Sequence, residues 1–195
     1  MHRLMSLIGG CTFLAMAALA APAIHAQQGA FTSLFDGATL KGWSRVGDAN
    51  WAVVDGAIQA TSGMGFLVSD ASYGDFQLTV EVWVDDAANS GVFFRLSDLK
   101  TILSTNSYEV NIWDRRPDPI YRTGAIVNVA SPSSVINAGG KWNTFDITAR
   151  GPRLTVVLNG TTVVDTEHKG WARGPLALQR NAGIVKFRSV RIRTL

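Results

Sequence analysis

Hydrophobic and polar residues alternate in short runs along most of this chain, and after the first 26 residues no stretch has a convincing helical period. Runs of period two predict β-strands with one buried face and one polar face. We expect strands at residues 51–54, 57–60, 66–68, 76–84, 92–96, 108–112, 125–129, 144–149, 153–158, 161–164, 176–179 and 185–192. The sequence therefore predicts an all-β protein.

Two of the expected turns are explicit. Asp55-Gly56 separates one pair of strand patterns, and Asn159-Gly160 separates another. Both dipeptides accept the positive φ angles of a two-residue hairpin turn. About a dozen antiparallel strands without helices must pack as two sheets or close into a barrel. Their number favours a jelly-roll β-sandwich of two antiparallel sheets over the smaller immunoglobulin type.

The N-terminus has the pattern of a signal peptide covering residues 1–26. A short basic start precedes an apolar run, and small residues follow it, with cleavage expected after Ala26 and Ala23 as the alternative. Cys11 raises the further alternative of a lipoprotein signal, but the apolar run continues beyond it. The run is too short for a lasting membrane anchor. We expect an exported protein, periplasmic or secreted.

The expected mature chain, residues 27–195, has the length of one domain. Cleavage removes Cys11, the single cysteine, so no disulfide can contribute to stability. The formal net charge of the full chain is +3, and its basic residues are scattered apart from the final strand pattern. That distribution gives no nucleic-acid-binding stripe, and a solvated strand face explains it better. The sequence leaves the oligomeric state open.

The acidic residues are unevenly distributed. Most aspartates occupy turn-like contexts such as "FDG" and "VDG", whereas Glu81 and Glu109 lie in the middle of strand patterns. Glutamate is a poor strand former. In "YEVNIWD" (residues 108–114), one face of the expected strand carries Glu109, Asn111 and Trp113. Long irregular stretches at 97–107 and 114–124 flank this strand, and long loops are often functional.

If the strands shared one sheet, several unusual residues would share one polar face. The contributors would be Thr79, Glu81, Trp83, Gly91, Phe93, Arg95, Glu109, Asn111, Trp113 and Gln179. Indoles stack on sugar rings, and carboxylates and amides bind hydroxyls, so this face predicts a sugar site. The alternative is a solvated face on which Glu81 and Arg95 form a cross-strand ion pair worth under about 1 kcal/mol. We favour function for Glu109 and Arg95 and leave Glu81 open.

Other catalytic constellations are missing from the sequence. His168 is the one histidine certain to remain after cleavage, which excludes a zinc site built on histidines. No nucleophile elbow accompanies it, and no phosphate-binding glycine loop is found.

Seven segments occur in the order found in a known family. They are "LFDGATLKGW", "NSGVFFR", "YEVNIWD", "TGAIVNVA", "GGKWNTFDI", "VVLNG" and "LALQRNAGIVKFRSVRI". From about residue 31 to 195 the chain resembles the 3-keto-disaccharide hydrolase domain family. The resemblance implies the concanavalin A-like lectin/glucanase sandwich as the fold.

The resemblance also implies a reaction. Family substrates carry a C3 ketone, which acidifies the C2 proton, so the glycosidic bond can break by elimination and water addition. This chemistry needs a base and a partner for the enolate. The resemblance then implies Glu109 as the base and Arg95 as the enolate or hydroxyl partner. Further expected substrate-binding residues are Glu81, Asn111, Trp113, Asp114 and Gln179, and Asp114 is also the candidate to orient a neighbour or hold a divalent cation.

Two departures keep a second function class open. Family members often have Leu-Gln-x-His-Gly where this chain has "LQRNAG", and many have Tyr where Val127 stands. A non-catalytic carbohydrate-binding module is therefore the alternative to a 3-keto-glycoside hydrolase or lyase. Ordinary retaining glucanases need two nearby carboxylates. This strand face offers Glu109 alone, with Asn111 and Trp113 beyond it, which disfavours that chemistry.

Overall fold

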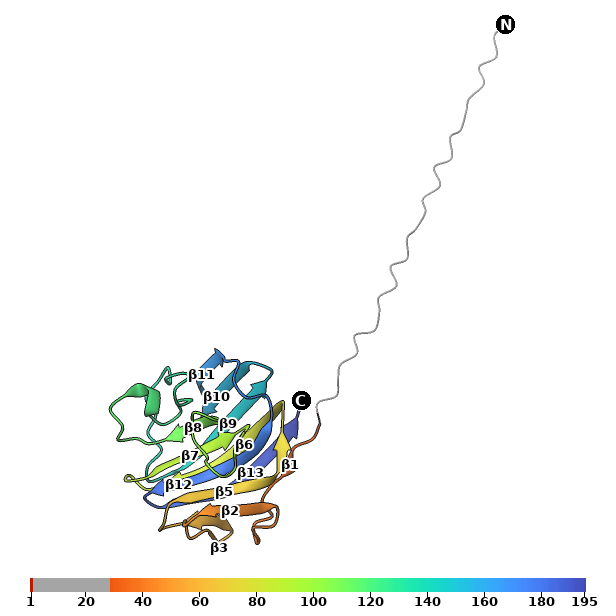
Figure 1. The fold of residues 1–195 in the computed structure, drawn as a ribbon. Coiled ribbons are helices and arrows are strands. Elements are labelled where there is room, and N and C mark those ends of the chain that lie inside the picture. Colours follow the sequence, from red (N-terminus) through yellow and green to blue (C-terminus); the bar gives the residue numbers. More distant parts are fainter. Residues whose placement is uncertain (2–28) are drawn as a thin grey trace.

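A computed structural model describes Met1 and residues 29–195, so the expected signal peptide lies outside the described residues apart from its first one. Residues 29–195 form two packed antiparallel sheets (Figure 1). Alternating side chains build a core between the sheets, and the expected jelly-roll β-sandwich is confirmed.

The larger sheet has eight strands. Seven are in the order β11-β10-β9-β6-β13-β4-β3, and the eighth, β1, pairs with the C-terminal end of β13. These strands are β1 (Thr32–Ser33), β3 (Ala52–Val54), β4 (Ala57–Ala60), β6 (Phe76–Val84), β9 (Trp142–Arg150), β10 (Arg153–Leu158), β11 (Thr161–Glu167) and β13 (Val185–Thr194). The last strand of the chain thus lies inside this sheet, between β6 and β4.

The smaller sheet has five strands in the order β2-β5-β12-β7-β8. They are β2 (Trp43–Gly47), β5 (Gly65–Tyr73), β12 (Gly174–Ala182), β7 (Asn89–Phe94) and β8 (Tyr108–Ile112). The strand that carries "YEVNI" is therefore an edge strand. Tyr108, Val110 and Ile112 are buried in the core between the sheets, so Glu109 and Asn111 point to the outer face.

Both expected hairpins are confirmed. Asp55 and Gly56 join β3 to β4 with φ angles of 51° and 73°, and Asn159 and Gly160 join β10 to β11 with φ angles of 51° and 82°. Paired positive φ angles match the right-handed twist of the flanking strands.

The strands differ from the expectation at three places. Residues 32–33 form the short β1 and residues 43–47 form β2, and the sequence predicted neither; polar residues interrupt the alternation of β2. Residues 125–129 were expected as a strand but form isolated bridges instead, from Ile126 to Val110 and to Ala130. This segment still contacts the edge of β8, since Val127 N donates to Glu109 O at 3.0 Å and Asn111 N donates to Ala125 O at 3.0 Å.

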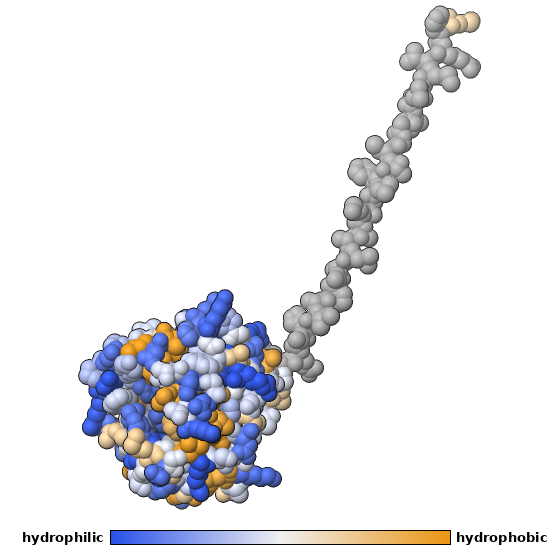
Figure 2. All heavy atoms as spheres, in the orientation of Figure 1, coloured by the Kyte–Doolittle hydropathy of each residue, from blue (hydrophilic) through white to orange (hydrophobic). Residues whose placement is uncertain are grey.

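Among the described residues the helical content is one short 3₁₀ turn, η1 (Pro119–Tyr121). None of the described helices is long and apolar enough to cross a membrane. Hydrophilic side chains cover most of the face seen in Figure 2, with apolar residues in scattered patches.

Candidate active site

The outer face of the five-stranded sheet brings together three of the expected site residues, which are Glu109, Asn111 and Gln179. In the strand register, Gln179 of β12 is opposite Gly91 of β7, and Gly91 is opposite Asn111 of β8. Residues directly opposite in antiparallel strands share a face, so these three form one row. Phe93 is opposite Glu109 in the adjacent row. We call the surface formed by Gln179, Gly91, Asn111, Phe93 and Glu109 the β8 face.

Glu109 has the most unusual environment on the β8 face. Its side chain is 8% exposed, and burial raises the pKa of its carboxyl from 4.5 to about 7. The carboxyl lies over Gly91, where an added Cβ would be 3.1 Å from Oε1. Within residues 29–195 the carboxyl has no hydrogen-bond or ion-pair partner. A carboxyl that titrates near neutrality can accept a proton from a substrate and return it.

Two amide oxygens on the same row lack partners. Asn111 is buried; its Nδ2 donates to Tyr121 O at 2.5 Å, while its Oδ1 is buried without a hydrogen bond from the described residues. Gln179 Oε1 is likewise buried and unpaired. An unpaired buried acceptor costs about 1–3 kcal/mol. Hydroxyl groups of a ligand bound on this row would offset that cost after a small side-chain adjustment.

A pocket adjoins the row at Gln179. Its cavity of about 320 Å³ is lined by apolar residues that include Val46, Phe66 and Ile102 and by polar residues that include Gln179 and Asn181. Asn181 is the residue found where the related family often has histidine. The sequence departure therefore lies in the wall of a real pocket next to the candidate site.

Trp113 directly follows β8 and is partly buried, with the Arg116 guanidinium 4.9 Å from its ring centroid.

Asp114 has a structural role. Its carboxylate accepts hydrogen bonds from Thr123 Oγ1 at 2.5 Å and from the backbone N–H groups of Ala138 and Gly139 at 2.8 Å. These donors occupy the oxygens that a metal ion would need, so Asp114 does not fit the role of a metal ligand.

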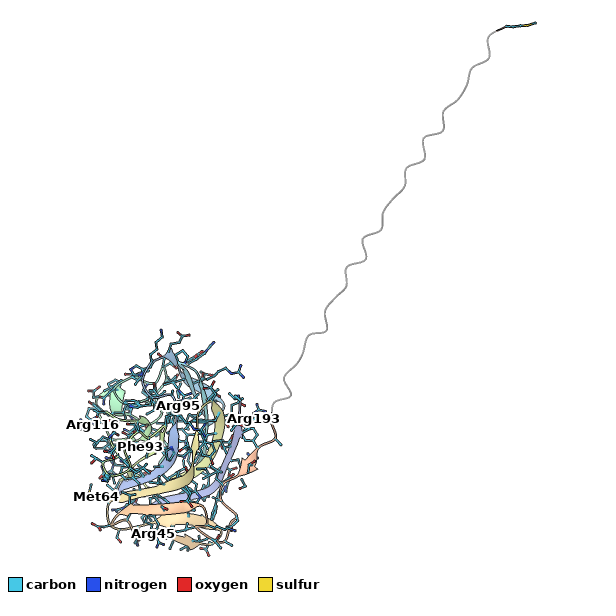
Figure 3. All side chains as sticks on the ribbon, turned by 45° about the vertical axis from the view of Figure 1, so that its right-hand side comes forward. Arg45, Met64, Phe93, Arg95, Arg116 and Arg193 are labelled. Carbon is cyan, nitrogen blue, oxygen red and sulfur yellow. The ribbon has the colours of Figure 1, made fainter. Side chains whose placement is uncertain are left out.

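Arg95 is not on the β8 face. β7 ends at Phe94, and Arg95 has a φ of 54°, which breaks the strand alternation. Its side chain is 1% exposed and donates to Asp75 at 2.9 Å and to the carbonyls of Gly74, Gly151 and Trp171. The expected grouping with Glu109 is wrong, because the donors of Arg95 are engaged with the loops at Gly74, Gly151 and Trp171. Arg95 nevertheless lies near Phe93 in the view of Figure 3.

Glu81 is also separated from the expected group. It belongs to β6 of the eight-stranded sheet, and its carboxylate pairs with Arg188 at 2.5 Å. The alternative considered for Glu81, an ion pair with Arg95, is wrong too, because Glu81 pairs with Arg188 and Arg95 pairs with Asp75. The alternation was read correctly within each strand, but β6 and β8 lie in different layers.

The sequence placed Gly91 on the polar face but gave it no role. Gly91 leaves the space that the Glu109 carboxyl fills, and a glycine inside a strand pattern was a usable signal for such a close approach. Other residues that shape the site were missed. Arg116 and Tyr121 lie in the loop after β8, where no periodic pattern indicates their direction. Within residues 29–195 no three His, Cys, Asp or Glu side chains cluster as metal ligands.

Comparison with known proteins agrees with this fold. A sequence model of the 3-keto-alpha-glucoside-1,2-lyase-like domain matches residues 30–193. A search of curated proteins finds no match.

Among solved structures, a candidate glycosyl hydrolase from Parabacteroides distasonis has a TM-score of 0.76 at 21% identity, over 85% of this chain and 94% of the other. The carbohydrate-binding module CBM66 from Bacillus subtilis has a TM-score of 0.64 at 22% identity, over 78% and 96%. A Bacillus licheniformis β-glucanase has a TM-score of 0.61 at 14% identity, over 88% and 100%. At these identities the structural matches show the fold alone.

Proposed function

The chain belongs to the family of 3-keto-alpha-glucoside-1,2-lyase-like domains, and on that premise we propose that it cleaves glycosides whose C3 hydroxyl has been oxidised to a ketone. Glu109 acts as the base. The observation that carries this proposal is a buried carboxyl with a pKa of about 7 on an outer sheet face, next to unpaired amide oxygens.

The ketone makes the C2 proton acidic, and Glu109 removes it. The electron pair left on C2 forms the C1–C2 double bond as the C1–O glycosidic bond breaks, and the leaving oxygen takes the proton that Glu109 removed. Water then adds across the double bond, with its proton going to C2 and its hydroxyl to C1. One base that titrates near neutral pH suffices, because the same carboxyl gives the first proton to the leaving oxygen and then takes a proton from water and passes it to C2.

The two amides of the β8 face bind the sugar, because the Asn111 and Gln179 side chains can pair with hydroxyl groups. Phe93 does not contact the sugar, since its ring is 1% exposed and packs in an apolar cluster with Ile102 and Ala177. The Asn111 Nδ2 already donates to Tyr121 O, so its unpaired Oδ1 is the atom left to accept a hydrogen bond from a sugar hydroxyl. Arg95 has no part in this scheme, since its donors are engaged with loops outside the face.

A carbohydrate-binding module is the second candidate. It is favoured by one observation, the presence of Asn181 rather than histidine in the pocket wall beside Gln179. If the family histidine takes part in the chemistry, this chain would bind the sugar without cleaving it.

The experiment that separates the two functions is incubation of the purified domain with a 3-keto-glucoside, with released sugar and aglycone measured over time. Release that depends on the protein supports the enzyme. Saturable binding without release, with and without added divalent cations, supports the module. A protein that neither binds nor cleaves the 3-keto-glucoside would contradict both functions.

We further propose that the protein acts after export, because residues 1–26 have the pattern of a signal peptide. Mass spectrometry of the protein made in a bacterial host tests this proposal. A mature N-terminus at Gln27 supports it, and an intact N-terminus contradicts it.

A further inference from the structure

Arg116 is held in a fixed position by two aromatic rings. Its guanidinium carbon is 4.9 Å from the centroid of Trp113 and 5.0 Å from that of Tyr121. Contacts of this kind are worth about 0.5–2 kcal/mol each, more as the site becomes drier. They fix where the cation lies without using its hydrogen-bond donors.

Those donors lack protein acceptors. Within residues 29–195 no carboxylate pairs with Arg116, its guanidinium donates no hydrogen bond, and its Nε is buried without a partner. Three other arginines have carboxylate partners, since Arg95 pairs with Asp75, Arg153 with Asp165 and Arg188 with Glu81. Among the arginines of residues 29–195, Arg116 is the one with a buried side-chain nitrogen that has no partner. A partly buried charge that is positioned but unpaired is expensive. It is the state expected of a side chain whose partner comes from a ligand.

The position of Arg116 relates it to the β8 face. Trp113 continues the strand that carries Glu109 and Asn111, and Asn111 Nδ2 donates to the carbonyl of Tyr121. Both rings that hold Arg116 are thus connected to the residue next to Glu109 on that face. In Figure 3, Arg116 and Phe93 lie on the left of the molecule, and Arg193 of the eight-stranded sheet lies on the right.

Hydrogen bonds hold the surrounding loop together and engage two of its carboxylates. Asp114 binds Thr123 and the backbone at residues 138–139, and Asp118 accepts from Ile120 N at the start of η1. Arg122 donates to Asn137 and to the carbonyl of Arg116. The loop therefore fixes Arg116 in place without a neutralising carboxylate.

We propose that Arg116 binds a carboxylate on the sugar, so that the preferred ligand of the β8 face is an acidic glycoside containing a uronic acid. The proposal rests on the proposed function in that it places a glycoside on this face. A guanidinium presents two parallel N–H donors, which match the two oxygens of a carboxylate. The charged pair forms beside two aromatic rings, where solvent screens it less than at an open surface.

The test is a binding comparison that needs no turnover. Isothermal titration calorimetry measures the affinity of the domain for 4-nitrophenyl glucuronide and for 4-nitrophenyl glucoside, which differ at C6. We expect the glucuronide to bind about tenfold or more tightly, the scale of a charge-assisted hydrogen bond. The preference should fall as the salt concentration rises.

The variants make the comparison specific. Arg116→Met should lose the preference while retaining glucoside binding, which also shows that it is folded, and Arg116→Lys should keep part of it. Arg115→Met is the matched control, because Arg115 is the exposed neighbour in the same loop and its removal changes the net charge equally. The control should keep the preference.

The proposal is overturned if the wild-type protein binds neither glycoside, if it does not distinguish them, or if Arg116→Met distinguishes them as well as wild type does. These outcomes are separable from failure of the proposed function. A protein that prefers the glucuronide through Arg116 but never cleaves a 3-keto-glycoside supports the binding proposal and contradicts the catalytic one. Cleavage without an Arg116-dependent preference does the reverse.

Discussion

The two sheets present polar outer faces that differ in one respect, which is whether their polar groups are paired. On the eight-stranded sheet, Glu81 pairs with Arg188 at 2.5 Å, and Arg153 pairs with Asp165 at 2.7 Å. On the five-stranded sheet, Glu109 has no partner in the described chain.

The amides follow the same contrast. Gln77 Oε1 of the eight-stranded sheet accepts from Arg193, whereas the amide oxygens of Asn111 and Gln179 on the β8 face are buried and unpaired. Polar residues on a sheet face are therefore weak evidence of function. Polar residues that the fold has positioned and left without partners are stronger evidence, since the protein bears the cost of desolvation without a compensating bond.

The largest effect is expected for Glu109→Gln, which should reduce cleavage of a 3-keto-glucoside about 10²- to 10⁴-fold while keeping the fold, because it removes the base but keeps the shape. Glu81→Gln is the matched control on the other sheet and should leave cleavage unchanged. Initial rates together with circular dichroism measure both. An active Glu109→Gln variant would show that the unpaired carboxyl of the five-stranded sheet is not the catalytic base.

Arg95→Met should instead destabilise the fold, by about 3–5 kcal/mol, because the buried Arg95 side chain is the shared donor to Asp75 and to three backbone carbonyls. Arg188→Met removes an exposed ion pair and should cost less than about 1 kcal/mol. Urea denaturation of the two variants measures the difference. Equal, small losses would show that Arg95 is not a structural linker.

The stability of the folded protein should depend on pH through Glu109. Burial raises its pKa from 4.5 to about 7, so the folded state holds this proton more tightly than the unfolded state does. The contribution is fully present below pH 4.5 and is lost as the pH rises through about 7, a change on the order of 3 kcal/mol. Denaturation between pH 4 and 8 should show this decline in wild type and not in Glu109→Gln. The kcat/KM for cleavage should rise over the upper part of the same range, as the base loses its proton.

Gly91→Ala should have the smallest effect of the four. The new methyl would be 3.1 Å from Glu109 Oε1 and 3.3 Å from the Phe93 ring, so the carboxyl must shift by a few tenths of an ångström. Misplacing a base by that amount should lower kcat by about tenfold with little change in KM. Steady-state kinetics at saturating substrate measures it, and a variant with wild-type kcat would show that the carboxyl does not depend on this space.

The fold was largely predictable because its signals are local. Alternation marked ten of the expected strands within a few residues of their bounds, and the Asp55-Gly56 and Asn159-Gly160 turns were identified from two residues each. The polar face was half predictable. Period two shows which residues of one strand share a face, but not which strands share a sheet, and so Glu81 and Glu109 looked equivalent.

Arg95 shows a second limit. The pattern continues through residues 92–96, yet the backbone turns to a φ of 54° at Arg95, and the side chain leaves the face. Arg116, the arginine that we propose as a ligand-binding residue, lies in a loop. The direction of its side chain depends on contacts with Trp113 and Tyr121 that no periodicity encodes. Loop residues beside a predicted strand therefore need the structure before they can be assigned.

The position of the final strands has a consequence for how the chain folds. β12 lies between β5 and β7, and β13 lies between β6 and β4, so the interior of each sheet is filled by residues 174–194. Neither sheet can be completed until the last part of the polypeptide has been synthesised. The pairings of β12 and β13 join residues that are far apart in the sequence. Folding dominated by such distant pairings is slow. Premature termination even shortly before residue 174 would leave two incomplete halves with open strand edges rather than a smaller working domain.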